Sequence, residues 1–144
     1  GTLMNEASNA ASVSHDLQMQ VVLDDESRVP LTATLAYEPS DPYAMMATFR
    51  TTEGDITWVF ARDLLRGGLT EPTGDGDIVI RPAHPSRGSL VLFTLSSPSG
   101  AARLEGERAE LQAFVDECYS VLPEGAEWRY MQVEAVISDL LREG

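Results

Sequence analysis

The stretch HDLQMQVVL, residues 15–23, alternates between two kinds of side chain. One set of positions holds His15, Leu17, Met19, Val21 and Leu23, and the set between them begins with Asp16, Gln18 and Gln20. A period of two is typical of a β-strand that buries one face and exposes the other. The regular structure of this chain is therefore predicted to begin with a half-buried strand.

The same alternation recurs three times after this strand, at Val29–Tyr37, Tyr43–Phe49 and Ile56–Phe60. The segments between the strands are DDESR (24–28), EPSDP (38–42) and TEGD (52–55). Each has four or five residues and is rich in turn formers, whereas a parallel crossover needs about a dozen or more. The four strands are therefore predicted to form an antiparallel meander.

A short helix is predicted after the fourth strand, over Ala61–Arg66. Asp63 near its start and Arg66 near its end match the helix dipole. The pair Gly67-Gly68 is expected to stop the helix. Arg62 stands next to Asp63, and we expect the two side chains to pair locally.

The second half repeats this plan in shorter form, with strands predicted near Asp77–Arg81, Ser89–Leu95 and Ala101–Glu105. The middle one is apolar on both faces, so we expect it to be central in the sheet.

Two amphipathic helices are predicted at the end of the chain, one over Glu107–Leu122 and one after PEGAE (123–127). Their apolar positions recur at helical spacing: Leu111, Phe114, Val115, Cys118 and Leu122 in the first, and Val133, Val136, Ile137, Leu140 and Leu141 in the second. Both helices should pack on the sheet or on a neighbouring subunit. The predicted fold class is α+β.

The length of 144 residues and the 43% hydrophobic content suit one domain with a real core. Residues 1–13 are small, polar and aperiodic, and we predict a disordered extension there, followed by a single domain over 14–144. An antiparallel sheet with an open face often completes its core against copies of itself. We therefore expect a homo-oligomer.

The charge of the chain excludes several function classes. Asp and Glu number 23 against 10 basic residues, giving a net charge of −13, and all ten cations are arginine. Without lysine there is no Walker-type phosphate loop, no Schiff-base site and no lysine general base. Binding to nucleic-acid phosphates normally requires a basic stripe, so no nucleic-acid partner is expected.

The segment TGDGD, residues 73–77, invites comparison with a phosphate or calcium loop. Asp75 and Asp77 would repel a phosphate, and no lysine follows them. If Asp75 opened an EF-hand loop, Ile80 would stand where glycine is needed and Ser86 where a bidentate glutamate is needed. The segment is therefore interpreted as a turn that enters a strand.

No other residue forms a convincing reactive site. DDESR (24–28) is interpreted as a solvated loop rather than a ligand cluster. His15 and His84 are the only histidines, and no G-x-S-x-G segment or evident triad accompanies them. His15 lies on the apolar face of its strand and is expected to be a core or subunit-contact residue. We assign no catalytic, cofactor-binding or metal-binding residue, and the partner-binding residues remain unassigned.

Two features bear on packing and location. Cys118, the only cysteine, permits no intrachain disulfide, suits a reducing cytoplasm and is expected to act as a small hydrophobe. Met45 and Met46 point to opposite faces of one strand, so one is assigned to the core and the other is open to an adaptable contact surface. The longest uncharged stretch, 88–102, is shorter than the ~20 residues that cross a bilayer, so no direct membrane insertion is expected.

Four segments together resemble the SsgA-like family of actinobacterial sporulation and cell-division proteins, nearest to its SsgB branch. They are DPYAMMATF (41–49), WVFARDLLRGGL (58–69), PTGDGDIVIRP (72–82) and LSSPSGAARLE (95–105). The likeness runs in order over most of residues 14–142. Met45-Met46 departs from the pattern, because a smaller or β-branched residue is expected after DPYA.

The resemblance implies a non-enzymatic regulator of sporulation-specific septation, located in the cytoplasm at the division septum. It implies recruitment of the tubulin-like division protein FtsZ to septum sites, promotion of its assembly, and contacts with SsgA-like paralogues. It also implies a whirly-like fold, a trimer and no cofactor. The whirly-like fold leaves one alternative open, a single-stranded nucleic-acid-binding protein, against which the charge of −13 argues.

Overall fold

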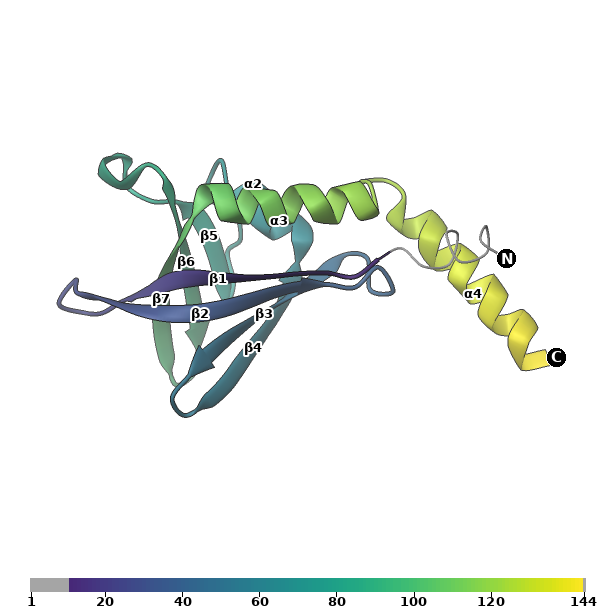
Figure 1. Cartoon of the computed structure of the whole chain (residues 1–144), viewed down its shortest axis with the longest axis horizontal. Helices are drawn as coiled ribbons and strands as arrows, with labels where there is room; N and C mark the ends of the chain where they lie inside the picture. Colours follow the sequence, from purple (N-terminus) through teal and green to yellow (C-terminus); the bar gives the residue numbers. More distant parts are fainter. Residues whose placement is uncertain (1–10, 144) are drawn as a thin grey trace.

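The computed structural model describes residues 11–143 and is built on one seven-stranded antiparallel sheet (Figure 1). The strands are β1 (Val13–Val22), β2 (Arg28–Tyr37), β3 (Ala44–Thr51), β4 (Gly54–Ala61), β5 (Ile78–Pro82), β6 (Leu90–Ser97) and β7 (Gly100–Glu107). The helices are α2 (Arg62–Gly68), α3 (Arg108–Val121) and α4 (Glu127–Glu143), with a 3₁₀ turn η1 (Pro85–Arg87). The extension predicted at 1–13 lies mostly outside the described residues, and β1 begins at Val13. The α+β fold class is confirmed.

The sheet consists of two meanders that meet at a short seam. The strand order is β4-β3-β2-β1-β7-β6-β5, so both meanders predicted from the sequence are present. They join where β1 pairs with β7, over Gln20–Val22 and Arg103–Glu105. The sheet curls at this seam into a half-barrel (Figure 1). β6 is an interior strand as predicted, but β1 and not β6 is in the middle of the sheet, because β7 pairs with β1.

The core lies between the concave face of the sheet and helix α3. Inward side chains of the strands, such as Met19, Leu35 and Phe93, are almost fully buried, and so are Leu111 and Phe114 of α3. The period-two strand positions and the 3.6-residue helix stripe therefore meet in one layer, as the pattern predicted.

The convex face is polar and is tied together by side-chain hydrogen bonds between strands. Thr34 Oγ1 donates to Asp16 Oδ1 at 2.6 Å, and Gln18 Nε2 donates to Thr32 Oγ1 at 3.0 Å. These are the positions that alternate with the buried ones. Cross-strand pairs of this kind each stabilise a sheet by roughly 0.2–1 kcal/mol.

The glycines expected to stop the first helix lie inside it. α2 runs to Gly68, and the next residue, Leu69, still has right-handed backbone angles and donates its N–H to the carbonyl of Arg66. A Cβ atom added to Gly68 would come within 2.3 Å of Cγ2 of Ile80. The helix does end at the glycine pair as predicted, but the expected left-handed cap is wrong, because Gly68 instead permits close packing of α2 on β5.

The last helix, α4, leaves the body of the protein at an angle (Figure 1). Only the first part of α4 touches the core, through the partly buried Tyr130. Ala126, the residue just before the helix, is also partly buried against the core. The predicted apolar stripe from Val133 to Leu141 is exposed. α3 thus packs on the sheet as predicted, whereas α4 does not pack on the sheet of its own chain.

Candidate functional site

An apolar cleft occupies the end of the concave face that α3 does not cover. Its volume is about 580 Å³. The cleft is lined by Val21, Leu31, Phe49, Thr51, Ile56, Trp58, Leu95, Ser97, Ser99, Gly100, Ala101, Ala102 and Leu104. We call this feature the apolar cleft.

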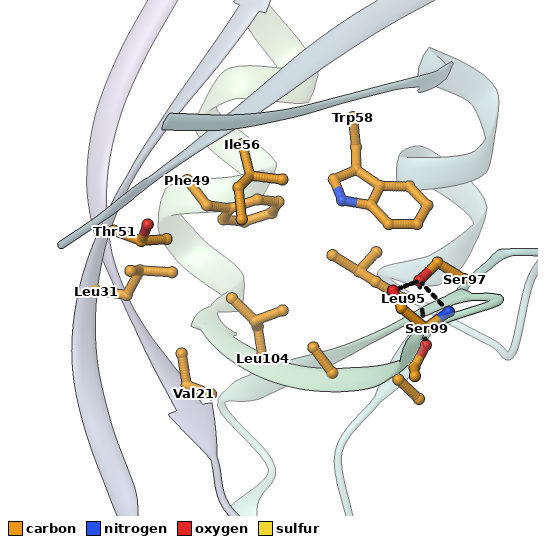
Figure 2. A pocket seen from close by; sticks show the side chains of 13 residues that line it. Val21, Leu31, Phe49, Thr51, Ile56, Trp58, Leu95, Ser97, Ser99 and Leu104 are labelled. Carbon is orange, nitrogen blue, oxygen red and sulfur yellow. Dashed lines mark hydrogen bonds between the residues drawn. The ribbon is translucent and has the colours of Figure 1, made fainter. Parts of the chain in front are cut away.

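Two hairpins form the walls of the apolar cleft. The β3–β4 hairpin contributes Ile56 and Trp58, and the β6–β7 hairpin contributes Leu95 and Leu104 (Figure 2). These residues occupy the inward, period-two positions of their strands, so the alternation that builds the core also lines the cleft. The hairpins extend past α3, so no helix within residues 11–143 covers these inward side chains.

Hydroxyl groups from both hairpins lie among the lining residues. Ser97 Oγ and Ser99 Oγ are 2.9 Å apart, and the Ser99 N–H donates to Ser97 Oγ at 3.3 Å (Figure 2). Thr51 Oγ1 donates to the carbonyl of Gly54 at 2.5 Å. The lining includes no charged side chain. Such a site suits apolar groups with few polar contacts and is unsuited to an anion or a metal ion.

A buried ion pair fixes the root of α4 on the opposite side of the core. Arg62 Nη2 lies 2.9 Å from Glu127 Oε2, and Nη1 donates to the carbonyl of Cys118 at 3.1 Å. The guanidinium also lies over the rings of Tyr37 and Tyr119, at 5.0 and 4.0 Å from their centroids. Arg62 is only 2% exposed. This set of contacts joins α2, α3 and α4.

The prediction that Arg62 pairs locally with Asp63 is therefore wrong. Asp63 instead pairs with Arg66 and accepts a hydrogen bond from Tyr119. Arg62 points into the core as the first residue of α2, while Asp63 points to solvent. The partner of Arg62 is Glu127, 65 residues away, which no local pattern could indicate.

The carboxylate of Glu127 is held in its charged form. Burial is the largest influence and raises its pKa, but hydrogen bonds from its own backbone and from Arg62 outweigh burial and lower the pKa overall. The N–H of Gly125 also donates to Glu127 Oε1 at 2.7 Å. These contacts set the direction in which α4 leaves the body.

A second buried carboxylate, Glu105, lies on β7 at the seam. Arg28 Nε and Arg87 Nη2 lie 2.9 and 3.1 Å from Glu105 Oε1. Burial raises the pKa of Glu105, and the hydrogen bonds from the two arginines more than offset it, so the pKa is lowered. Within the described residues, seven of the ten arginines pair with a carboxylate: Arg28, Arg50, Arg62, Arg66, Arg87, Arg103 and Arg142. Most of the positive charge is thereby neutralised.

The loop TGDGD forms the bend predicted before a strand. β5 begins directly after it, at Ile78, and Gly74 has a φ of +97°, where a side chain would be strained. In the part of the chain that the structure describes, no three His, Cys, Asp or Glu side chains form a group that could hold a metal ion. Asp75 and Asp77 are exposed.

The other sequence candidates lie apart from the cleft. In DDESR, Asp25 Oδ1 accepts hydrogen bonds from the hydroxyl and N–H of Ser27, which lower the Asp25 pKa. His15 packs edge-on against Phe114, and its Nε2 lies 3.1 Å from Glu117 Oε2.

His84 caps the start of η1, where its Nδ1 accepts a hydrogen bond from the N–H of Ser86 at 3.1 Å. The two histidines therefore have separate partners. Cys118 is buried, and burial raises the pKa of its thiol to about 12, in line with the predicted hydrophobic role. Met45 is in the core and Met46 is exposed on the convex face, as the strand pattern required.

Comparison with known proteins identifies the family. The family described as "Streptomyces sporulation and cell division protein, SsgA" matches residues 31–127. The chain belongs to the SsgA family. The sporulation-specific cell division protein SsgB of Streptomyces coelicolor is 40% identical over 133 residues, covering 92% of this chain and 97% of that protein. SsgB of Frankia casuarinae is 40% identical over 134 residues, covering 92% and 94%.

Solved structures agree with the SsgA-family assignment. A crystal structure of an SsgA-like sporulation-specific cell division protein from Thermobifida fusca has a TM-score of 0.82 at 35% identity, covering 90% of this chain and 95% of that one. A structure linked to SsgB and longitudinal cell division during sporulation of Streptomyces coelicolor has a TM-score of 0.78 at 43% identity, covering 83% and 95%. The chain is thus a sporulation-specific cell division protein of the SsgA family and not an enzyme.

Three of the four segments that carry the SsgA-family resemblance meet at the apolar cleft. DPYAMMATF supplies Phe49, WVFARDLLRGGL supplies Trp58, and LSSPSGAARLE supplies the β6–β7 hairpin. The sequence did not reveal the cleft, although the uncharged hairpin tip in LSSPSGAA was a signal for it. Over residues 11–143, no helix is both long and apolar enough to cross a bilayer.

Proposed function

We propose that this chain recruits the division protein FtsZ to sporulation septum sites and promotes its assembly, acting as a homotrimer in the cytoplasm together with SsgA-like paralogues. Membership of a family of sporulation and cell division proteins supports this role. The surfaces of a single chain suit it as well, because two apolar features remain uncovered by the part of the chain that the structure describes. These are the apolar cleft and the stripe of α4.

The exposed stripe of α4 is the observation that carries the proposal. Val136, Leu140 and Leu141 are 54%, 65% and 76% exposed on a helix that leaves the body. Soluble proteins seldom leave such a row of large apolar side chains uncovered unless another protein covers it. A trimer built through α4 would cover this stripe and leave the acidic body facing other division proteins.

The role in FtsZ assembly is tested with purified proteins. Light scattering and pelleting would follow FtsZ of Streptomyces coelicolor with GTP, with and without this chain. We expect the chain to pellet with FtsZ and to increase the polymer signal. No co-pelleting, together with an unchanged polymer signal, would reject the proposal.

The trimer has a separate test. Light scattering coupled to size exclusion should give three times the chain mass for the wild type and the single-chain mass for Leu140→Glu. Gln132→Glu adds the same charge to the same helix away from the apolar stripe and should leave the trimer intact. A wild-type chain that elutes as a monomer at every concentration would contradict the trimer.

The nucleic-acid alternative is tested by fluorescence anisotropy of labelled single strands at low salt. We expect no binding, because most arginines are already paired with carboxylates and the net charge is −13. Micromolar binding that weakens with salt would favour the alternative.

A further inference from the structure

The two edges of the sheet differ in how they are protected. The outer side of β5 is bridged by Thr73, whose N–H and carbonyl bond to Ile80 at 2.9 and 3.0 Å. β5 also carries Arg81 and ends at Pro82, which cannot donate to another strand. Helix α2 also packs closely on Ile80 at Gly68 and covers the same edge. The β5 edge therefore cannot readily accept a further strand.

The β4 edge has none of these protections. Among residues 11–143, only β3 pairs with β4. The segment Ile56–Ala61, ITWVFA, contains no charge, proline or glycine and is rich in β-branched and aromatic residues. Natural proteins usually block a strand edge of this composition. An unprotected strand edge next to an apolar cleft therefore indicates a binding role for this edge.

The direction of the backbone groups on β4 follows from the ladder. Arg62 donates its N–H to the carbonyl of Tyr43 at the end of the β3–β4 pairing. Hydrogen-bonded pairs recur at every second residue of an antiparallel ladder. The even-numbered residues of β4 therefore bond to β3. The N–H and C=O groups of odd-numbered residues such as Thr57 and Val59 point away from β3, toward the free edge.

The side chains of the same strand enter the apolar cleft at the alternate positions. Ile56 and Trp58 line the cleft opposite Leu95 (Figure 2). A strand added to the β4 edge would place every second side chain in line with theirs, over the cleft. Addition of a peptide strand to a sheet edge, with pockets for alternate side chains, is a general mode of peptide recognition.

We propose that the β4 edge and the apolar cleft together bind an extended peptide segment of a partner protein, which pairs with β4 and places alternate apolar side chains in the cleft. The uncharged lining sets the apolar alternation. The net charge of −13 favours basic residues flanking the segment, because the field of the whole chain attracts cations. The site does not depend on which division protein supplies the peptide, so it goes beyond the proposed role with FtsZ.

The experiment titrates the isotope-labelled full chain with the blocked peptide acetyl-Lys-Val-Thr-Val-Thr-Val-Lys-amide and follows amide and indole NMR signals. We expect saturable shifts at the amides of Thr57 and Val59 and at the Trp58 indole. Thr57 amide exchange should slow at least about fivefold. The indole of Trp128, exposed on α4, is the internal reference. A peptide with proline at both its first threonine and its central valine loses a bonding N–H in either strand direction and should bind at least tenfold more weakly.

Two variants separate the edge from the cleft. Thr57→Pro removes one free-edge N–H and leaves the β3 ladder intact, and Ala102→Phe fills the cleft from the opposite wall. Each should weaken peptide binding at least tenfold while circular dichroism stays unchanged. Thr48→Val is the matched control for Thr57→Pro, because it breaks the same hydroxyl contact between Thr48 and Thr57 from the interior strand, and it should bind like the wild type.

Three results would overturn the proposal. The first is the absence of shifts at millimolar peptide. The second is binding that survives both Thr57→Pro and Ala102→Phe. The third is a set of Thr57 and Val59 shifts that depend on protein concentration without peptide, which would make the β4 edge a contact between copies of this chain. A failed FtsZ assay with successful peptide binding would reject the FtsZ role alone.

Discussion

The two ends of the curled sheet are built from the same strands but differ in what covers them. At the filled end, Phe60 of β4 is 8% exposed and lies in the core with α3. At the open end, Ile56 of the same strand is 51% exposed and lines the apolar cleft. Both positions point inward and are apolar. The difference therefore arises from the length of α3 and not from the strand pattern.

This contrast separates what stabilises the fold from what is available for binding. Inward residues under α3 gain the free energy of burial within the chain, about 25 cal/mol per Å² of apolar surface. Inward residues beyond α3 remain partly exposed, so part of their burial free energy can be gained only when another molecule binds and covers them. The expected effects of substitutions at the two ends differ accordingly.

The largest difference is expected between Phe114→Ala and Ile56→Ala. Phe114 is 1% exposed at the filled end, and its removal should leave a cavity and lower the free energy of unfolding by about 3–5 kcal/mol. Ile56→Ala at the open end should cost less than about 1.5 kcal/mol, because half of the side chain is already in water. Urea denaturation followed by circular dichroism measures both. Equal losses would mean that the cleft belongs to the core.

The next effect concerns the buried pair that fixes α4. Arg62→Met should lower the free energy of unfolding by about 3–5 kcal/mol, because Glu127 would remain charged and buried without its partner. The double variant Arg62→Met with Glu127→Gln should recover a large part of this loss in the same denaturation experiment. If the double variant were as unstable as the sum of the two single variants, the pair would not be coupled.

Local patterns were sufficient to predict the elements of this fold. The alternation in HDLQMQVVL and its repeats is confirmed in β1 to β4, and the helical spacing of Leu111 and Phe114 is confirmed in α3. These signals involve residues only a few positions apart. They reflect which side chains face the core, and the spacing of apolar residues along the sequence indicates this directly.

The features that depend on distant residues could not be predicted in the same way. The seam pairs Val21 with Leu104, the ion pair joins Arg62 to Glu127, and the apolar cleft requires two hairpins about 40 residues apart in sequence to face each other. Gly68 was misassigned for the same reason, since its partner Ile80 comes from the next strand. Only the resemblance to a family could point to such long-range arrangements.

A pH-dependent effect of intermediate size is expected at the seam. The pKa of Glu105 is lowered from its ordinary value of 4.5 in the folded protein, so the folded state binds its proton more weakly than the unfolded state. The stabilisation from this carboxylate is complete at neutral pH and is lost as the pH falls below about 5 and through the lowered pKa. Glu105→Gln should lower the free energy of unfolding at pH 7 by about 1–3 kcal/mol.

The same substitution should flatten the acid limb of the stability profile. Denaturation midpoints of the wild type and Glu105→Gln, measured from pH 7 to pH 3, should converge as the pH falls. Glu110→Gln, at an exposed position of α3, is the control and should follow the wild type. Parallel profiles for the wild type and Glu105→Gln would contradict a lowered pKa at the seam.

The smallest effect is expected from the ion pair on the convex face of the open end. Arg50 Nη1 lies 2.5 Å from Asp55 Oδ2 in the β3–β4 hairpin, but both side chains are about half exposed. Arg50→Ala should therefore change the free energy of unfolding by no more than about 0.5 kcal/mol, and less at 1 M salt, because water and salt screen exposed pairs. The measurement is urea denaturation at low and high salt. A loss above about 1.5 kcal/mol would mean that charge pairing, and not strand pairing with β3, holds this wall of the cleft in place.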